Sequence, residues 1–334
     1  MLRSTRSVLA VIAAAAILLA GCGQAKPQAD NTSGPAKVNF PTKPVTIIVP
    51  FAAGGGTDVL ARMLGNAAKN TLSQPVVVEN KAGGSGMVGM ADGSKASPNG
   101  YTVTMVTVEL VTVPHMQSVP VQGDDFKYVM RLNFDPSAIT VRADSPYKTL
   151  KDFLDAAKAK PGTMKIGNSG PGAIWDLATY QLEAATGTKF VHTPYQGAGP
   201  AMTDLIGGHI DAVAVSPAEV SAQVAAGKLR ILGVMSDSRW SSFPDVPTLK
   251  ESGVNVSLGT WRGLAVPKST PDAVVAILHD GFKRAMDTPE FKETFAKTGL
   301  GAGYMDGKSF GGFVKNEDER FTKLINDLGL AQKK

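Results

Sequence analysis

A glycine-rich turn at residues 50–58 (PFAAGGGTD) is the part of the sequence best suited to binding chemistry. It follows an apolar, strand-like run at 45–49 and precedes an amphipathic helical pattern. Consecutive glycines let backbone N–H groups approach a ligand, and the positive end of the following helix favours negative charge there. The turn has neither the Lys-Ser/Thr pair of a phosphate loop nor the G-x-G-x-x-G spacing of a dinucleotide site, so a small carboxylate fits it better than a nucleotide. Its candidate ligand contacts are Phe51, Ala53, Gly54, Gly55, Gly56, Thr57 and Asp58.

A second turn repeats this order of strand, glycines and helix. Residues 164–167 lead into the turn 168–173 (NSGPGA) and then into a helical pattern that reaches residue 185. Two such turns that face each other would hold ligand carboxylates through backbone N–H groups and the hydroxyls of Thr57 and Ser169. The alternative is that both are tight strand-to-helix turns, which use glycine for their geometry alone. The candidate contacts here are Asn168, Ser169, Gly170, Gly172 and Ala173, with Trp175 and Asp176 in the following helix.

Charged and aromatic side chains near these turns would set specificity. Asp58 and Glu109 would recognise an ammonium group or a co-bound cation, or would instead cap a helix or loop. Arg131 and Arg262 offer forked bonds to a further carboxylate, although surface ion pairing is the more frequent role of an arginine. Trp175 would stack on an aromatic acid or pack at a domain junction. The four histidines are scattered without metal-ligand spacing, so we expect no metal and no cofactor.

The amino-terminal region has the pattern of an export signal. Arg3 and Arg6 precede an apolar run at 8–20, which is too short to span a membrane comfortably. The run ends in Leu-Ala-Gly-Cys, which resembles the lipobox of bacterial lipoproteins, and Cys22 is the only cysteine in 334 residues. We therefore predict a lipoprotein signal peptide at 1–22, a lipidated Cys22, no disulfide framework, and a flexible tether at 23–39.

The charge of the chain excludes little by itself. Removing the signal takes away two arginines and no acid, so the formal net charge falls from +5 to +3. Because no cluster of Lys and Arg accompanies this mild excess, the sequence gives little support for a nucleic-acid partner.

Strand-like and helix-like patterns alternate through the 295 residues that follow the tether (334 − 39). This length suffices for two domains of ordinary size, and the alternation predicts an α/β fold with parallel-rich sheets flanked by helices. The predicted strands are 76–79, 101–106, 138–142, 164–167, 211–215 and 229–234. The predicted helices are 148–158, 173–185 closed by Gly187, and 200–206 closed by Gly207-Gly208.

The carboxy-terminal part is mainly helical. Thr270-Pro271-Asp272 and Thr288-Pro289-Glu290 each supply a cap, a proline at the first helical position and an acid in the first turn. Gly299 would end the second of these helices. A last helix is predicted from near Ser309 to Leu328, stopped at Gly329.

An enzyme is the main rival class. Residues 307–311 (GKSFG) satisfy the G-x-S-x-G pattern of serine hydrolases, but the catalytic acid and histidine must follow the serine, and no histidine occurs after His279. We therefore expect a protein that is not an enzyme, in which Ser309 is a helix cap.

Several motifs stand in the order and approximate spacing of one known family. They are residues 44–58, 74–80 (QPVVVEN), 98–101 (PNGY), 192–197 (HTPYQG), 205–211 (LIGGHID), 226–230 (AGKLR) and 244–248 (PDVPT). They span nearly all of the chain after the tether, and the chain resembles the Bug receptors, the solute-binding proteins of tripartite tricarboxylate transporters. Residues 108–115, 131–133 and 259–264 are most similar to the branch associated with citrate and other tricarboxylates.

The resemblance implies a two-lobed periplasmic-binding-protein fold of type II (Venus flytrap). The chain would cross between lobes near residues 138 and 258, so that 40–137 and 259–334 form one domain and 138–258 the other. It also implies capture of a carboxylate between the two turns, partly through ordered water, and delivery to a membrane permease that runs on an ion gradient. Thr107, Tyr195 and Ser216 fall at strand ends that face the cleft in relatives.

One departure from the family pattern bears on the ligand. Relatives in this branch often carry a histidine after the tryptophan of the second turn's helix, where this chain has Asp176. Together with Asp58 and Glu109, this acid counts against assuming citrate. We expect a di- or tricarboxylate, with amino acids or aromatic acids as alternatives, and presentation of the ligand to a membrane sensor kinase as the alternative to transport. The expected protein is an extracytoplasmic monomer anchored through Cys22.

Overall fold

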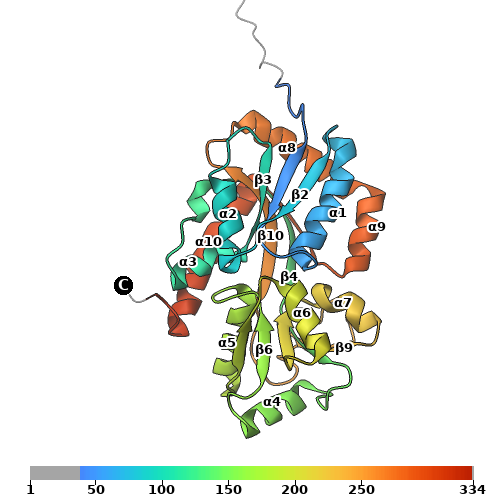
Figure 1. Ribbon diagram of the computed structural model, residues 1–334, viewed down its shortest axis with the longest axis vertical. Coiled ribbons are helices and arrows are strands. Elements are labelled where there is room, and N and C mark those ends of the chain that lie inside the picture. The colour runs from blue at the N-terminus through green and yellow to red at the C-terminus, as the bar shows by residue number, and fades with distance from the viewer. Residues whose placement is uncertain (1–37, 333–334) are drawn as a thin grey trace, which may run out of the picture. The chain divides into compact units, whose positions relative to one another are not determined.

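The structure is a computed structural model that describes residues 38–332. The predicted signal peptide, Cys22 and most of the predicted tether lie outside the described residues. Strands gather into two sheets, and helices flank both of them (Figure 1). Within the described part, no helix is long and apolar enough to cross a membrane.

The first sheet has six strands in the order β11-β4-β10-β3-β1-β2. Its strands are β1 (Val45–Val49), β2 (Val76–Asn80), β3 (Thr102–Thr107), β4 (Phe126–Pro136), β10 (Gly259–Pro267) and β11 (Ala302–Asp306). The central strands β1, β3 and β10 are almost wholly buried, as expected of apolar runs covered on both faces.

The second sheet has five strands in the order β7-β6-β8-β5-β9. They are β5 (Ala138–Arg142), β6 (Lys165–Asn168), β7 (Val191–Pro194), β8 (Ala212–Val215) and β9 (Leu229–Val234). The predicted bounds 45–49, 138–142 and 229–234 are confirmed. The predicted strands 76–79 and 211–215 differ from the structure by one residue at one end, and 101–106 and 164–167 are each shifted by one residue.

Both sheets mix parallel and antiparallel pairs, within the predicted α/β fold of sheets flanked by helices. Strands β1 and β6 each pair in parallel with two neighbours, but β4, β10 and β11 pair antiparallel, as does β5 with β8 and β9. The reason is the path of the chain. It leaves the first sheet along β4 and returns along β10, so these two adjacent strands run in opposite directions.

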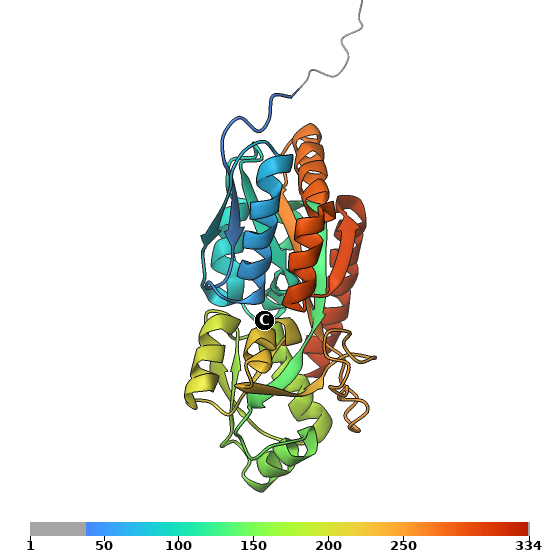
Figure 2. The same cartoon turned by 90° about the vertical axis from the view of Figure 1, so that its right-hand side faces the viewer.

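Helices surround each sheet (Figures 1 and 2). Beside the first sheet lie α1 (Gly56–Thr71), α2 (Met87–Ser94), α3 (Val113–Met116), α8 (Asp272–Asp287), α9 (Pro289–Thr298), α10 (Gly307–Asp327) and the short 3-10 turns η1 (Gly84–Gly86), η2 (Val108–Val111) and η3 (Gly123–Asp125). Beside the second lie α4 (Leu150–Ala159), α5 (Ile174–Thr186), α6 (Ala198–Gly207) and α7 (Pro217–Ala225).

Two hydrophobic clusters hold these layers. One joins α1 and α8 to the first sheet through residues such as Leu64, Leu278 and Phe282. The other begins under α2 and α10, where Trp261 packs edge-on against Phe310 with ring centroids 5.3 Å apart, and continues into the second sheet. Because this cluster is continuous, apolar packing joins the two sheets beside the site described below.

The chain passes between the sheets along neighbouring segments. Only Ser137 separates β4 from β5. The Ser137 amide donates to the Leu258 carbonyl (2.8 Å), the Met235 amide to the Ser137 carbonyl (2.7 Å), and the Leu258 amide to the Met235 carbonyl (3.0 Å). Backbone hydrogen bonds thus tie the passages into one narrow connection.

Helix ends agree with the sequence in most places. Gly187, Gly208 and Gly299 follow α5, α6 and α9 in the left-handed conformation that favours glycine. Thr288 caps α9 as predicted, since its side chain accepts a hydrogen bond from the Phe291 amide at 3.2 Å.

Two predicted caps are wrong. At α8 the extended residue before the helix is Pro271, so Thr270 lies one position too early to cap it. At α10 the cap is Asp306, whose carboxylate accepts from the Ser309 amide at 2.9 Å, and the helix begins at Gly307 rather than near Ser309. An acid at the end of β11 occupies the capping position before the serine can.

Candidate functional site

A small cavity lies where the two glycine turns approach each other. Its volume is about 20 Å³, roughly the space of one water molecule. Both turns contribute to its wall, as do residues before α6, in α7 and in β10. The lining residues are Phe51, Gly55, Thr57, Thr107, Glu109, Ser169, Ile174, Trp175, Gly197, Ala198, Glu219, Thr260 and Arg262.

Asp58 holds the first turn in shape from behind. Its carboxylate accepts from the Gly54 amide (3.0 Å), from Arg62 Nε (3.1 Å) and from the Asn80 side-chain amide (2.9 Å). Burial alone would raise the pKa of Asp58, but these bonds and the charge of Arg62 outweigh it and lower the pKa. Because Asp58 is committed to the turn and does not line the cavity, the structure favours the capping interpretation over cation recognition.

Asp176 does the same for the second turn. It accepts from the Gly172 amide (3.0 Å) and the Asn168 side-chain amide (2.9 Å), and it lies 2.6 Å from His192 Nδ1. In both turns a carboxylate four residues after a glycine thus receives that glycine's N–H. Asp176 therefore supports the turn rather than facing a ligand, so its presence in place of a histidine does not place an acid in the cavity wall.

Each turn also forms hydrogen bonds to elements beside the other sheet. The Ala52 amide donates to the Gln196 carbonyl at 2.9 Å. On the other side, Ser85 Oγ donates to the Pro171 carbonyl (2.8 Å), and Thr112 Oγ1 donates to the Gly172 carbonyl (2.9 Å). These contacts close the cavity on both sides.

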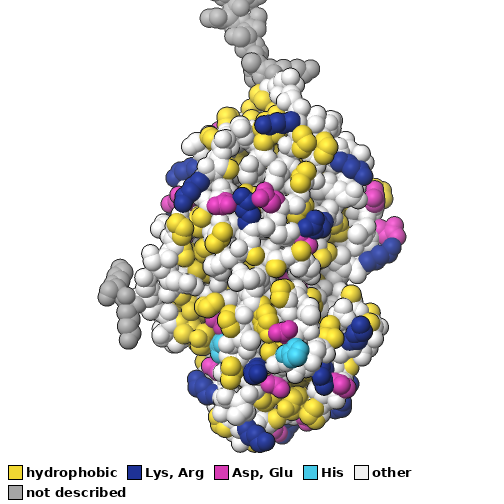
Figure 3. All heavy atoms as spheres, in the orientation of Figure 1, with side chains coloured by type: hydrophobic (Ala, Val, Ile, Leu, Met, Phe, Trp, Pro, Cys, Tyr) yellow, Lys and Arg dark blue, Asp and Glu magenta, His cyan; other side chains and the backbone are white. Residues whose placement is uncertain are grey.

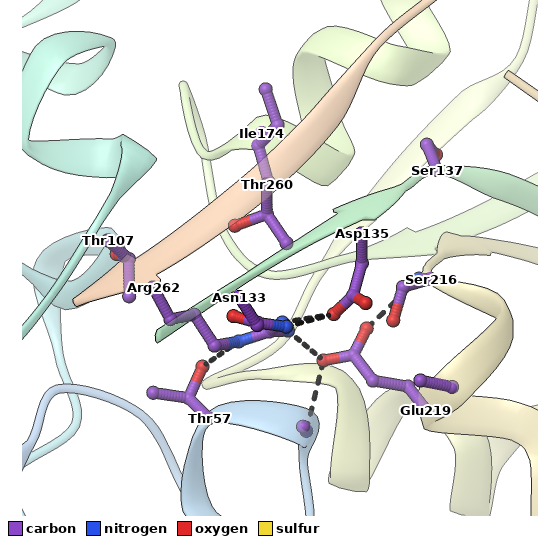
Figure 4. Close-up of polar contacts among 12 residues, drawn as sticks. Thr57, Thr107, Asn133, Asp135, Ser137, Ile174, Ser216, Glu219, Thr260 and Arg262 are labelled. Carbon is purple, nitrogen blue, oxygen red and sulfur yellow. Dashed lines mark hydrogen bonds and ion pairs between the residues drawn. The ribbon is translucent and has the colours of Figure 1, made fainter. Parts of the chain in front are cut away.

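Arg262 is the charged centre of the site (Figure 4). From β10 it donates through Nε to Thr57 Oγ1 (2.9 Å), through Nη1 to Asp135 (2.5 Å) and through Nη2 to Glu219 (3.2 Å). Its side chain is 2% exposed and that of Asp135 is fully buried. The guanidinium is therefore occupied by protein groups, and it orders the wall of the cavity.

Arg131 does not reach the cavity. Its Nε donates to the Gly303 carbonyl at 2.6 Å, and its guanidinium lies 4.5 Å from the centre of the Phe313 ring. The two arginines proposed from sequence as carboxylate partners thus have different positions, and Arg262 alone of the pair lines the site.

Glutamates occupy both helix amino termini at the cavity. Glu219 Oε1 accepts from the Gly56 amide, the first residue of α1, at 3.1 Å. Glu109 Oε1 accepts from the Ile174 amide, the first residue of α5, at 3.1 Å, and Glu109 Oε2 accepts from Thr107 Oγ1 at 2.5 Å. Burial raises the pKa of both carboxyls, and the charge of Arg262 opposes this rise.

The structure brings together eight of the residues predicted from sequence to contact ligand. These are Phe51, Gly55, Thr57, Thr107, Glu109, Ser169, Trp175 and Arg262. Other predicted residues, among them Ala53, Gly54, Gly56, Gly170 and Ala173, belong to the turns without lining the cavity. Tyr195 donates its hydroxyl to Asp204 at 2.6 Å, and Ser216 precedes α7; neither is in the wall.

Five lining residues were not predicted. They are Ile174, Gly197, Ala198, Thr260 and Glu219. Glu219 had a local signal, since Ser216-Pro217-Ala218-Glu219 has the Ser-x-x-Glu pattern of a capping box. That pattern predicts the start of α7, but it does not predict the hydrogen bond that Glu219 accepts from α1.

The serine of the G-x-S-x-G pattern is engaged in a local contact. Ser309 Oγ donates to Asp306 at 2.8 Å, in the first turn of α10. Among residues 38–332, no group of three or more His, Cys, Asp or Glu side chains is arranged to hold a metal ion. On the face seen in Figure 3, basic and acidic side chains are interspersed.

The chain has two sheets flanked by helices and joined by crossing strands, and two helix amino termini meet at a cavity between the sheets. This architecture is that of the extracytoplasmic solute-binding proteins. The model of the tripartite tricarboxylate transporter family receptor matches residues 60–330, and the chain belongs to that family.

Three comparisons illustrate the relationship. The chain is 35% identical over 325 residues to a protein of Cupriavidus necator described as "UPF0065 protein in gbd 5'region", with 96% of each chain covered. It is 42% identical, with a TM-score of 0.63, to the crystal structure of a TctC solute-binding protein from Polaromonas, covering 86% of this chain and 99% of that one. It is 26% identical, with a TM-score of 0.81, to MatC of Rhodopseudomonas palustris, solved with bound malate, covering 86% of this chain and all of that one.

Proposed function

We propose that this receptor captures a small carboxylate between its two glycine turns and delivers it to the permease of a tripartite tricarboxylate transporter. One observation carries the proposal. The amino termini of α1 and α5 both reach the cavity, and each already binds a carboxylate, that of Glu219 or Glu109. Helix amino termini favour such anions through their unpaired N–H groups and the helix dipole. The similar protein MatC holds malate, a dicarboxylate, which supports this class of ligand.

The ligand enters when the two halves of the molecule separate. A cavity of about 20 Å³ holds roughly one water molecule, far less than a dicarboxylate needs. We therefore propose that residues 40–137 with 259–334 move against 138–258, about the connection at Ser137, Met235 and Leu258. A ligand shifts this equilibrium toward a closed state whose cavity is wider than in this structure, to the extent that it binds that state more tightly, and the permease engages that state.

The receptor is proposed to be a monomeric lipoprotein on the outer side of a membrane. The support lies in the sequence: residues 1–22 have the pattern of an export signal, and Cys22 at its end is the only cysteine of the chain. The segment from residue 23 to 39 would then be the tether between the lipid and the folded part.

Isothermal titration calorimetry against a panel of di- and tricarboxylates, amino acids and aromatic acids tests ligand capture. We expect dissociation constants of about a micromolar for the preferred compound, since a few charge-assisted hydrogen bonds, less the cost of ordering, suffice for that affinity. Binding of nucleotides but of no carboxylate would contradict the proposal. Small-angle scattering with and without the preferred compound tests closure, and an unchanged radius of gyration at saturation would contradict that step.

Uptake by proteoliposomes that contain the cognate permease tests delivery. Addition of the loaded receptor is expected to start uptake of labelled ligand along an imposed ion gradient. A receptor that binds ligand but never supports uptake would instead favour the sensing role.

A further inference from the structure

Each of the two glutamates at the cavity belongs to one half of the molecule and binds a helix amino terminus of the other half. Glu219 belongs to α7 beside the second sheet, yet it binds the Gly56 amide at the start of α1 beside the first. Glu109 follows β3 of the first sheet, yet it binds the Ile174 amide at the start of α5 beside the second. A carboxylate from each half thus occupies the helix amino terminus at which the other half would bind an anion. A ligand meets these built-in anions whenever the cavity closes.

The charges around the cavity do not balance. Arg262 is the base, and it pairs with Asp135 at 2.5 Å and with Glu219 at 3.2 Å. Glu109 has no cation within ion-pairing distance among the described residues; its partners are the Thr107 hydroxyl and a backbone amide. Counted as ionised, three acids stand against one base, a formal excess of two negative charges. Burial raises the pKa of Glu109 and Glu219 and so opposes this excess until a cation arrives.

Neighbouring charges do not correct this excess. Behind the first turn, Asp58 has its own cation in Arg62, at 2.9 Å. Behind the second turn, Asp176 lies 2.6 Å from His192. Arg131 is turned toward the Gly303 carbonyl. No further lysine or arginine of the described chain lines the cavity.

The glutamates are deeply buried, which makes their charged form dependent on a positively charged partner. Glu109 is 2% exposed and the Glu219 side chain 4%. Burying an unpaired charge is costly unless a counter-charge or a proton neutralises it. A dicarboxylate would double the formal excess from two to four, whereas a zwitterion adds no net charge and brings a cation to the glutamates.

The wall also offers groups for the other end of such a ligand. Ser169 is 4% exposed, and its hydroxyl lines the cavity without a hydrogen-bond partner. A hydroxyl in that state can donate to a carboxylate. Phe51 and Trp175 add aromatic surface, which attracts cations through the negative faces of the rings.

We propose that Glu109 and Glu219 select a ligand that carries a positively charged group beside its carboxylate. The inference rests on the proposed capture of a small carboxylate and narrows its class. The carboxylate takes the place of a glutamate at a helix amino terminus or binds Ser169, and the cation pairs with the acids left in the wall. A plain dicarboxylate of the same length is disfavoured.

Matched ligand pairs test this selection by calorimetry on the purified protein. Glycine betaine and 3,3-dimethylbutanoate have the same shape and differ in one positive charge, and aspartate and succinate differ in one ammonium group. Malate, citrate and benzoate complete the panel. We expect the cationic member of at least one pair to bind at least tenfold more tightly than its partner.

Two variants identify the residues responsible. Glu109→Gln and Glu219→Gln each keep the size of the side chain, remove its charge and replace one acceptor oxygen by an amide donor. Each is expected to reduce the preference at least threefold. Glu290→Gln, at an exposed position in α9, is the matched control and keeps it. Melting curves check that each variant is folded, and either glutamine variant alone suffices for the comparison.

The outcomes separate the two proposals. Tighter binding of succinate, malate or citrate than of every cationic compound overturns the charge selection and leaves carboxylate capture standing. The same holds if the cationic preference is unchanged in both glutamine variants. If none of the carboxylates binds, with or without a positive group, carboxylate capture itself fails.

Discussion

Replacing Gly199 by alanine should prevent full closure without changing the wall of the cavity. Gly199 is the second residue of α6, and it does not line the site. An added Cβ would lie 2.7 Å from the Ala53 carbonyl oxygen in the first turn, and 3.4 and 3.5 Å from the backbone of Gly54 and Gly55. The obstruction is backbone, so no flexible side chain can move out of the way.

The cost should fall on the closed state alone. Overpacking of this kind costs about 1–3 kcal/mol, which weakens the binding of a ligand to the closed state by about 5-fold to 150-fold. The separated halves should not suffer, because alanine is a better helix residue than glycine by up to about 1 kcal/mol. The expected signature is therefore weaker binding with an unchanged or higher melting temperature.

Calorimetry with the preferred ligand and thermal unfolding of the ligand-free protein measure these two quantities. Gly312→Ala is the matched control, because Gly312 also lies in a helix, α10, and an added Cβ there meets nothing within 4 Å. Affinity of Gly199→Ala equal to that of the control would refute the view that the contact between α6 and the first turn is part of the binding-competent state.

Three further predictions concern other parts of the chain. Asp58→Ala should lower the free energy of unfolding by about 1–3 kcal/mol in urea titrations, because it removes the buried carboxylate that accepts part-buried hydrogen bonds from the Gly54 amide and the Asn80 side chain. A loss no larger than that of an exposed Asp→Ala variant would contradict this role. Burial alone would lower the pKa of His192, but the hydrogen bond and charge of Asp176, with Glu183, outweigh it and raise the pKa above 6.5. The protonated pair should thus stabilise the protein fully below about pH 6.5, and progressively less as the pH rises through the raised pKa. His192→Gln should flatten this pH dependence of the free energy of unfolding between about pH 6 and 8. Cys22→Ser should release the protein from membranes on cell fractionation, and retention in the membrane fraction would argue against lipidation.

The sequence was most informative where local patterns determine local structure. The run at 45–49 and the glycines after it predicted β1, the first turn and α1, and the echo at 164–185 predicted β6, the second turn and α5. In both cases glycine and apolar periodicity reflect the geometry of a strand-to-helix turn, which depends on neighbours in sequence. Which residues of these turns contact ligand stays a prediction.

The roles of residues that depend on contacts far away in the sequence could not be predicted. Glu219 was visible as part of a helix cap, but its bond to Gly56 spans 163 positions of the chain. Arg131 and Arg262 looked alike in sequence, and only the register of β4 and β10 turns one toward the cavity and the other toward β11. Asp58 was ambiguous because an acid in a helix's first turn serves a ligand or its own turn equally well by pattern, and Asp176 was predicted only as a ligand contact.

The narrow connection at Ser137, Met235 and Leu258 limits how this molecule can move. Sliding one sheet past the other would break all three backbone hydrogen bonds, at roughly 0.5–1.5 kcal/mol each, whereas rotation about the line that joins them keeps every one. Opening is thereby reduced to nearly one angular coordinate. In the proposed opening motion, residues far from the cavity would move furthest for a given rotation, so the permease would detect an occupied site best at the surfaces farthest from the cavity.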